Sequence, residues 1–130
     1  MNNKEIIVGF FEEAYTKKNY DYVMKYFSEN YIDYSPAGAR SNKDAVGILK
    51  IVHEMFNDLK ITVLDVFEEN GMVATRIEYE GIHISDCMGI PATGKKIKWE
   101  ALENFRVENK IVTESWGYWP DAAIEEMLRS

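Results

Sequence analysis

Cysteine and histidine are scarce in this sequence, and long apolar runs are missing. Cys87 stands alone, so neither an intramolecular disulfide nor a thiolate metal cluster is expected. His53 and His83 are the only imidazoles, which makes a zinc site unexpected. No apolar run approaches the roughly 20 residues that a membrane-spanning helix needs. Because Glu12 and Glu13 interrupt the apolar N-terminal stretch, no signal peptide is expected, and we predict a cytoplasmic protein.

Basic residues are also few. The chain has 15 lysines and arginines against 22 acidic residues, which gives a net charge of -7. A nucleic-acid partner is not expected, because phosphate binding needs a clustered basic surface. The length of 130 residues and the hydrophobic content of 46% are typical of a single globular domain, which we assign to residues 1–130.

Helical periodicity fills much of the first half of the chain. Apolar side chains recur at helical spacing over residues 3–18, 22–27 and 41–56. A brief strand over residues 31–35 is expected to end at Pro36. His53 falls off the apolar stripe of its helix, so a surface position is predicted for it.

From residue 59 onward the pattern is typical of strands. Asn70-Gly71 between two β-rich runs is a strong hairpin signal. Further strands are expected over residues 95–107 and 111–119, followed by a short closing helix. Helices first and antiparallel strands afterwards indicate an α+β domain, in which helices cover one face of a curved sheet.

Two strands of this sheet carry apolar residues on both faces. Period two places Phe67 on the same face as Ile61, and Trp116 on the same face as Val112, with further apolar residues opposite. A sheet that is apolar on both faces is usually covered on both. We therefore predict a homodimer that packs through the sheet.

Three polar residues stand out among the apolar positions. Glu103 lies on the inward face of its strand, where a carboxylate must pair, stay protonated with a raised pKa, or reach water at a pocket mouth. His83 shares the inward face of the preceding strand, either as a proton-transfer group or as a histidine bonded at the core edge. Tyr15 lies on the apolar stripe of the first helix, either in the core or aimed at a pocket.

Short motifs carry a family resemblance. They are a strand end with Gly81 and His83, the loop GIPATGK at residues 89–95, and a final strand that contains Lys110, Ile111 and Trp116. With these motifs the sequence resembles the SnoaL-like polyketide cyclases and ester cyclases over nearly the whole chain. The resemblance implies a cone-shaped α+β barrel with an apolar pocket between helices and sheet, usually dimeric.

The same resemblance implies ring closure by an intramolecular aldol condensation that needs no cofactor. In the family one carboxylate after the final strand acts as acid and base. Counting from Trp116, the family position falls on Pro120, and Asp121 follows it. The hypothesis for this chain is that His83 or Asp121 moves the proton, while Glu103 and Tyr15 stabilise an enolate.

The expected ligand is an apolar small molecule with a carbonyl group. Its pocket is predicted to be lined by Trp99, Phe105, Met88, Met55, Phe56, Trp116 and Tyr34. Two alternatives remain open from the sequence. One is a binding module of the same fold that holds a ligand without catalysis, and the other is a structural dimer whose cone is filled.

Overall fold

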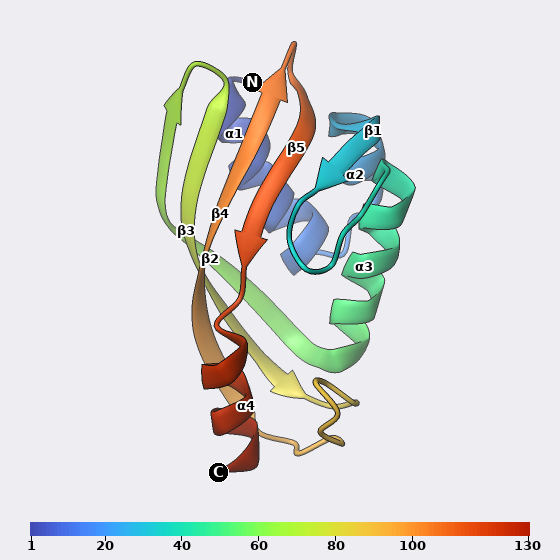
Figure 1. Cartoon of the computed structure of the whole chain (residues 1–130), viewed down its shortest axis with the longest axis vertical. Helices are drawn as coiled ribbons and strands as arrows, with labels where there is room; N and C mark the ends of the chain where they lie inside the picture. Colours follow the sequence, from blue (N-terminus) through green and yellow to red (C-terminus); the bar gives the residue numbers. More distant parts are fainter.

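Helices cover one face of a curved five-stranded sheet in the computed structural model, which describes residues 1–130 (Figure 1). The N-terminal elements are α1 (Asn3–Gly9), the π-helical segment η1 (Phe10–Thr16), α2 (Asp21–Tyr26), β1 (Phe27–Asp33) and α3 (Asn42–Met55). The later elements are β2 (Phe56–Glu69), β3 (Met72–His83), β4 (Lys96–Glu108), β5 (Ile111–Tyr118) and α4 (Asp121–Arg129). The first predicted helix therefore becomes π-helical halfway, and the first strand begins earlier than expected.

The strand order is β1-β5-β4-β3-β2, with β1 parallel to β5 and all other neighbours antiparallel. Since β1 and β2 are the two edges and do not pair, the sheet is curved but open rather than a closed barrel. The predicted α+β class is confirmed, and so is the hairpin, whose turn residues Asn70 and Gly71 have φ values of 51° and 81°. None of the helices has the length and apolar character needed to cross a membrane.

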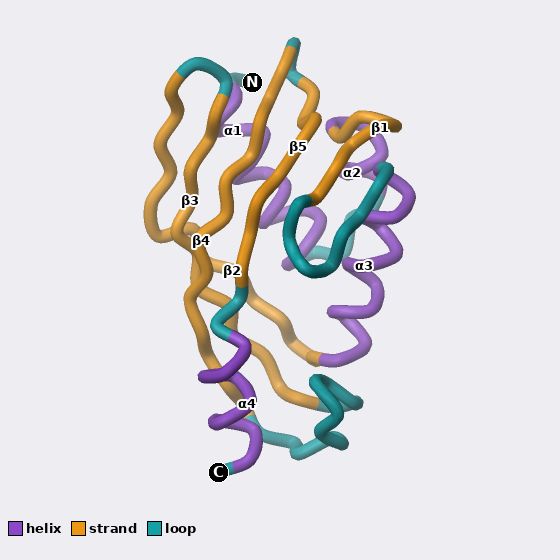
Figure 2. Tube along the Cα trace, in the orientation of Figure 1, coloured by secondary structure: helices purple, strands orange, loops and turns teal.

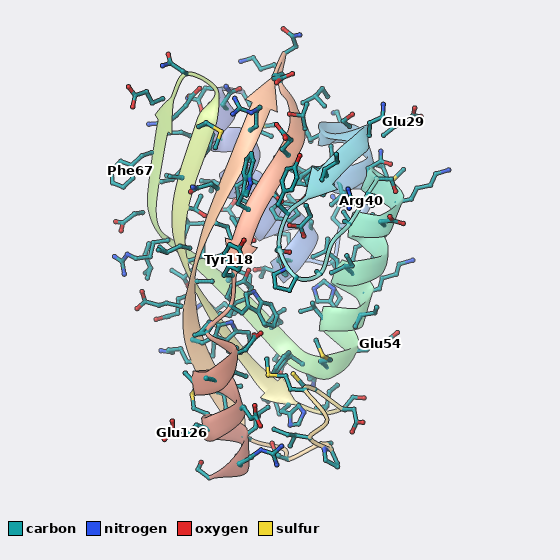
Figure 3. The ribbon with its side chains drawn as sticks, in the orientation of Figure 1. Glu29, Arg40, Glu54, Phe67, Tyr118 and Glu126 are labelled. Carbon is teal, nitrogen blue, oxygen red and sulfur yellow. The ribbon has the colours of Figure 1, made fainter.

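Two bulges decide which side chains face the helices. Between Val63 and Asp65 one extra residue enters β2, and between Val112 and Glu114 one enters β5. Each extra residue reverses the alternation of the strand that follows it. The prediction that Phe67 shares a face with Ile61 is therefore wrong, and Figure 3 shows Phe67 pointing away from the helices.

The bulge in β5 has the same effect on its aromatic residues. Trp116 and Tyr118 pair with Asn104 and Leu102 on the outer face, so Trp116 does not share the face of the buried Val112 as predicted. The inward positions after the bulge are the small residues Ser115 and Gly117, which leave space between the sheet and the helices.

His53 is buried rather than exposed, which corrects the prediction of a surface position. Its ring on α3 lies between the Tyr20 hydroxyl, 2.7 Å from Nδ1, and the Tyr15 carbonyl oxygen, 2.7 Å from Nε2. Because both ring nitrogens have partners, the imidazole is accommodated in the interior as the neutral form. Burial lowers its pKa. His53 thus ties α3 to the π-helical segment that carries Tyr15.

The segment between β1 and α3, residues 34–41, runs from the edge of the sheet back towards the helices (Figure 2). Two backbone hydrogen bonds hold it, from the Tyr34 N–H to the Ser115 carbonyl oxygen at 2.8 Å and from the Asp33 N–H to the Ala39 carbonyl oxygen at 2.9 Å. This segment and α3 form one side of the pocket described next.

Candidate active site

A pocket of about 440 Å³ lies between α3, the segment after β1, and the inner face of β4 and β5. This volume is within the range of about 300–1,000 Å³ that is usual for small-molecule sites. Four residues of α3, Ile48, Ile51, Val52 and Met55, make much of its wall apolar. We call this space the main pocket. Met55, one of these four residues, lines the pocket as the sequence predicts.

Glu103 lies at the floor of the main pocket, on β4 and directly opposite Gly117 of β5. Its side chain lies over the glycine so closely that a Cβ added at Gly117 would stand 2.6 Å from Glu103 Cγ and 2.8 Å from Oε1. The other carboxyl oxygen, Oε2, accepts a hydrogen bond of 2.6 Å from the buried Tyr79 hydroxyl. Gly117 and Tyr79 thus fix the position of this carboxyl group.

Burial raises the pKa of Glu103 to about 7. The negative charge of Asp33 acts in the same direction, while the hydrogen bond from Tyr79 lowers the pKa because it stabilises the carboxylate. At neutral pH the group therefore exists in both its acid and its base form. This is the property that a residue needs in order to accept and return a proton during one reaction.

Tyr15 reaches the main pocket from η1, on the helical side. Its ring packs edge-on against Tyr79, with 5.7 Å between the ring centres, and stacks on Phe11. Burial, and then the charge of Glu103, raise the pKa of Tyr15 well above its usual value of 10. The hydroxyl group therefore stays protonated and is able to donate a hydrogen bond.

Asp33, at the end of β1, is a second carboxylate in the main pocket and is not among the predicted site residues. It accepts hydrogen bonds of 2.8 Å from both the backbone N–H and the hydroxyl of Ser35. The Ser115 hydroxyl, which is also hydrogen-bonded to the Tyr31 hydroxyl, lies 3.3 Å from Asp33 Oδ1. Parallel pairing of β1 with β5 brings Asp33 opposite Ser115, and no local pattern reveals such a pairing.

His83 lies outside the main pocket, which corrects the prediction that it enters the site. The imidazole is fully buried, and its Nδ1 accepts a hydrogen bond of 3.1 Å from the Thr93 backbone N–H. The physical reason is that the segment after β3 folds back over the strand end, with a hydrogen bond from the His83 N–H to the Lys95 carbonyl oxygen. His83 therefore anchors this loop.

Asp121 lies at the rim of the main pocket, where α4 begins, and is exposed. Its backbone N–H donates a hydrogen bond of 2.9 Å to the Trp119 carbonyl oxygen in the turn between β5 and α4. The predicted carboxylate after the last strand therefore borders the pocket but is solvated. Glu103 is less exposed than Asp121, because it is partly covered at the floor of the pocket.

The predicted aromatic lining is largely wrong. Phe56 and Trp99 are buried in the core behind the pocket wall, where Trp99 stacks on Tyr79 and contacts Trp119. Phe105 is also buried and lines a smaller space beside the main pocket instead of the main pocket itself. Three further predicted residues face solvent or the outer side of the sheet, namely Met88, which is exposed in its loop, and Trp116 and Tyr34, which stack on each other. Trp119, which follows β5, supplies the aromatic wall instead.

No group of three or more histidine, cysteine or acidic side chains is arranged to hold a metal ion. The polar groups that line the main pocket include the carboxyl groups of Glu103, Asp33 and Asp121 and the hydroxyl of Tyr15. Such a set is suited to proton transfer in an apolar surrounding.

Comparison with known proteins identifies the family to which this chain is similar. A sequence model described as SnoaL-like polyketide cyclase matches residues 5–128. No curated protein matches the sequence significantly. Among solved structures, IdmH from Streptomyces antibioticus, a candidate polyketide cyclase, is 20% identical and has a TM-score of 0.88, with 100% of each chain covered.

Two other solved structures are similar in fold. A candidate SnoaL-like polyketide cyclase from Jannaschia sp. CCS1 is 16% identical with a TM-score of 0.90, covering 98% of this chain and 92% of the other. AclR from Streptomyces galilaeus, a candidate hydroxylase, is 23% identical with a TM-score of 0.85, covering 98% and 95%. At these identities the likeness to the solved structures concerns the fold.

Proposed function

We propose, from the premise that this chain belongs to the SnoaL-like polyketide cyclase family, that it moves a proton at a carbon next to a carbonyl group. The proposed ligand is an apolar small molecule that fits the main pocket. The observation that carries the proposal is Glu103, a carboxyl group fixed over Gly117 with a pKa raised to about 7. The proposed chemistry needs no cofactor.

In the proposed reaction the Glu103 carboxylate accepts the proton from the carbon next to the carbonyl group. The carbonyl oxygen gains negative charge as the enolate forms, and the Tyr15 hydroxyl donates a hydrogen bond to it. The raised pKa of Tyr15 supports this role, because a protonated phenol is the donor that is required.

The proton held by Glu103 returns to the substrate in one of two ways. In an isomerisation, protonated Glu103 returns its proton to another carbon of the enolate. In a ring closure, the enolate carbon attacks a second carbonyl carbon of the same molecule, and the new alkoxide takes the proton from Glu103. The apolar wall formed by Ile48, Ile51 and Met55 supports a ligand with a hydrophobic body.

Deuterium exchange tests this function. The probe is 4-hydroxy-4-phenylbutan-2-one in D₂O, and NMR follows the loss of protons on the carbons next to its ketone. The wild type is expected to accelerate exchange, and Glu103→Gln to lower the rate by about 10²- to 10⁴-fold. Glu100→Gln, on the exposed face of the same strand, is the matched control and is expected to retain the rate.

The result that overturns the assignment is exchange that survives in Glu103→Gln or is lost instead in Asp121→Asn. A probe that binds without any exchange in the wild type favours the alternative, a non-catalytic binding protein with the same pocket.

We also propose that the chain forms a homodimer through the outer face of the sheet. Phe67, Leu102 and Tyr118 are 67%, 65% and 60% exposed there, and they border one shallow groove. The groove is flanked by charges of both signs, including Arg76 and Asp65, which suits a face that meets a copy of itself.

Light scattering at micromolar concentration tests the dimer. Leu102→Glu is expected to give a monomer, whereas Met24→Glu, which adds the same charge at an exposed residue of α2, is expected to stay dimeric. A wild type that scatters as a monomer overturns the proposal.

A further inference from the structure

A second, much smaller space opens beside the main pocket. This side cavity has a volume of about 50 Å³ and shares Glu103, Tyr15 and Asp33 with the main pocket. It extends from these residues towards the core, between β1, β5 and the start of α3, where Ala45 forms part of its wall. The two spaces therefore meet at the residues to which we assign the chemistry.

The polar groups of the side cavity are unusually many for so small a space. Two carboxyl groups, of Glu103 and Asp33, and three hydroxyl groups, of Tyr15, Tyr31 and Ser115, lie in its wall. Tyr31 and Ser115 are buried, and their hydroxyls are hydrogen-bonded to each other. Ser115 also lies 3.3 Å from Asp33 Oδ1, so these groups form a connected set.

The size of the side cavity limits what it is able to hold. A buried water molecule needs a cavity of at least about 10–15 Å³ by this measure, together with two to four polar partners. The side cavity, at about 50 Å³, therefore has room for water, and it has enough donors and acceptors to bind it.

We propose that the side cavity is a water site, and that the protein uses it to eliminate water from a β-hydroxy ketone. This inference rests on the proposed function, because it needs the same proton transfer by Glu103. It adds a second step, the departure of a hydroxyl group, and it names the substrate class as compounds with a hydroxyl two carbons from the carbonyl carbon.

The elimination balances without any further reactant. The Glu103 carboxylate takes the proton from the carbon between the carbonyl group and the carbinol carbon, and Tyr15 holds the enolate oxygen. The enolate electrons then form the carbon–carbon double bond as the carbon–oxygen bond breaks. The leaving oxygen takes the proton from Glu103, so the products are an α,β-unsaturated ketone and water, and Glu103 is again a carboxylate.

The position of the side cavity explains why one carboxyl group suffices. The hydroxyl must leave beside Glu103 in order to receive its proton, and the side cavity opens at that residue. The water that forms is then received by the Asp33 carboxylate and the Ser115 hydroxyl instead of remaining against the new double bond. Microscopic reversibility gives the same site the role of delivering water in the hydration direction.

The probe 4-hydroxy-4-phenylbutan-2-one reports both steps separately. NMR in D₂O follows proton exchange next to the ketone, and the ultraviolet absorbance of the conjugated product follows loss of water. The wild type is expected to catalyse both. Ala45→Val, which fills the side cavity, is expected to lower the ratio of elimination to exchange by about tenfold, the effect of losing about one hydrogen bond to the leaving water.

Two further variants make the result independent of folding defects. Ser115→Ala removes a polar partner while leaving the volume open, and it is expected to lower the same ratio. Val46→Leu adds volume on α3 one residue away but outside both spaces, and it is expected to leave the ratio unchanged. Thermal melting of each variant checks that it is folded.

The outcomes separate this inference from the proposed function. Exchange without elimination in the wild type overturns the water site and leaves the proposed function standing. An unchanged ratio in both Ala45→Val and Ser115→Ala also overturns it. Absence of exchange in the wild type overturns the proposed function itself, and elimination is then absent as well.

Discussion

Replacing Glu103 by glutamine is expected to stabilise the protein by an amount that grows with pH. Burial raises the pKa of Glu103 from 4.5 to about 7, so the folded state holds this proton more tightly than the unfolded state does. Between these two values the unfolded chain has released the proton while the folded chain still holds it. The free energy of unfolding of the wild type therefore falls as the pH rises through this window.

The size of the effect follows from the same two values. Each pH unit in the window is worth about 1.4 kcal/mol. Glu103 in its ionised form thus costs the wild type about 3 kcal/mol of stability above pH 7, and nothing below about pH 4.5. The carboxamide of the Glu103→Gln variant keeps an oxygen for the Tyr79 hydroxyl and does not ionise, so it avoids this cost.

Urea unfolding followed by tryptophan fluorescence measures the difference between the two proteins from pH 4 to pH 8. Protein concentration is held constant, because a dimer gains stability with concentration. All other titrating groups are shared, so they cancel in the difference, and Glu100→Gln controls for the loss of one exposed charge. A difference between wild type and Glu103→Gln that stays constant with pH refutes the raised pKa.

The remaining predictions concern the support of this carboxyl group. Gly117→Ala places a methyl group 2.6 Å from Glu103 Cγ, so we expect a loss of about 1–3 kcal/mol in urea unfolding and slower exchange. Tyr79→Phe removes the 2.6 Å hydrogen bond to the carboxylate, so the pH midpoint of exchange is expected to rise; a fall contradicts the assigned cause. His53→Leu leaves the Tyr15 carbonyl oxygen without its partner, so we expect a loss of about 1–3 kcal/mol in thermal or urea unfolding, and an unchanged stability argues against this role.

The inward position of Glu103 is predicted correctly from the sequence because β3 and β4 pair without interruption. Thr75 stands opposite Glu103 and Tyr79 opposite Trp99, so strict alternation holds along both strands. The hairpin turn and the α+β class are readable for similar reasons, since local turn chemistry and the order of elements determine them.

The predictions that failed depend on features that local alternation does not show. A bulge in β2 and another in β5 turn Phe67 and Trp116 outward, although period two places them with buried residues. The bulge in β5 also turns Ser115 and Gly117 inward, where they shape the site. Asp33 is missed because it reaches the pocket only through the parallel pairing of β1 with β5.

His83 shows a different limit of reasoning from sequence. Its strand face is predicted correctly, since the imidazole points inward and is fully buried. Its role depends on the loop that follows, because the Thr93 backbone N–H occupies Nδ1 and closes the strand end. A residue type that suits catalysis thus serves here to hold a loop in place.

The most direct test of the account is the pH dependence of wild-type proton exchange on 4-hydroxy-4-phenylbutan-2-one. If Glu103 is the base, the rate rises with a midpoint near pH 7, the value to which burial raises the pKa of this carboxyl group, and is constant above it. A midpoint near pH 4, the ordinary range of an unperturbed carboxyl group, contradicts the assignment of proton transfer to Glu103.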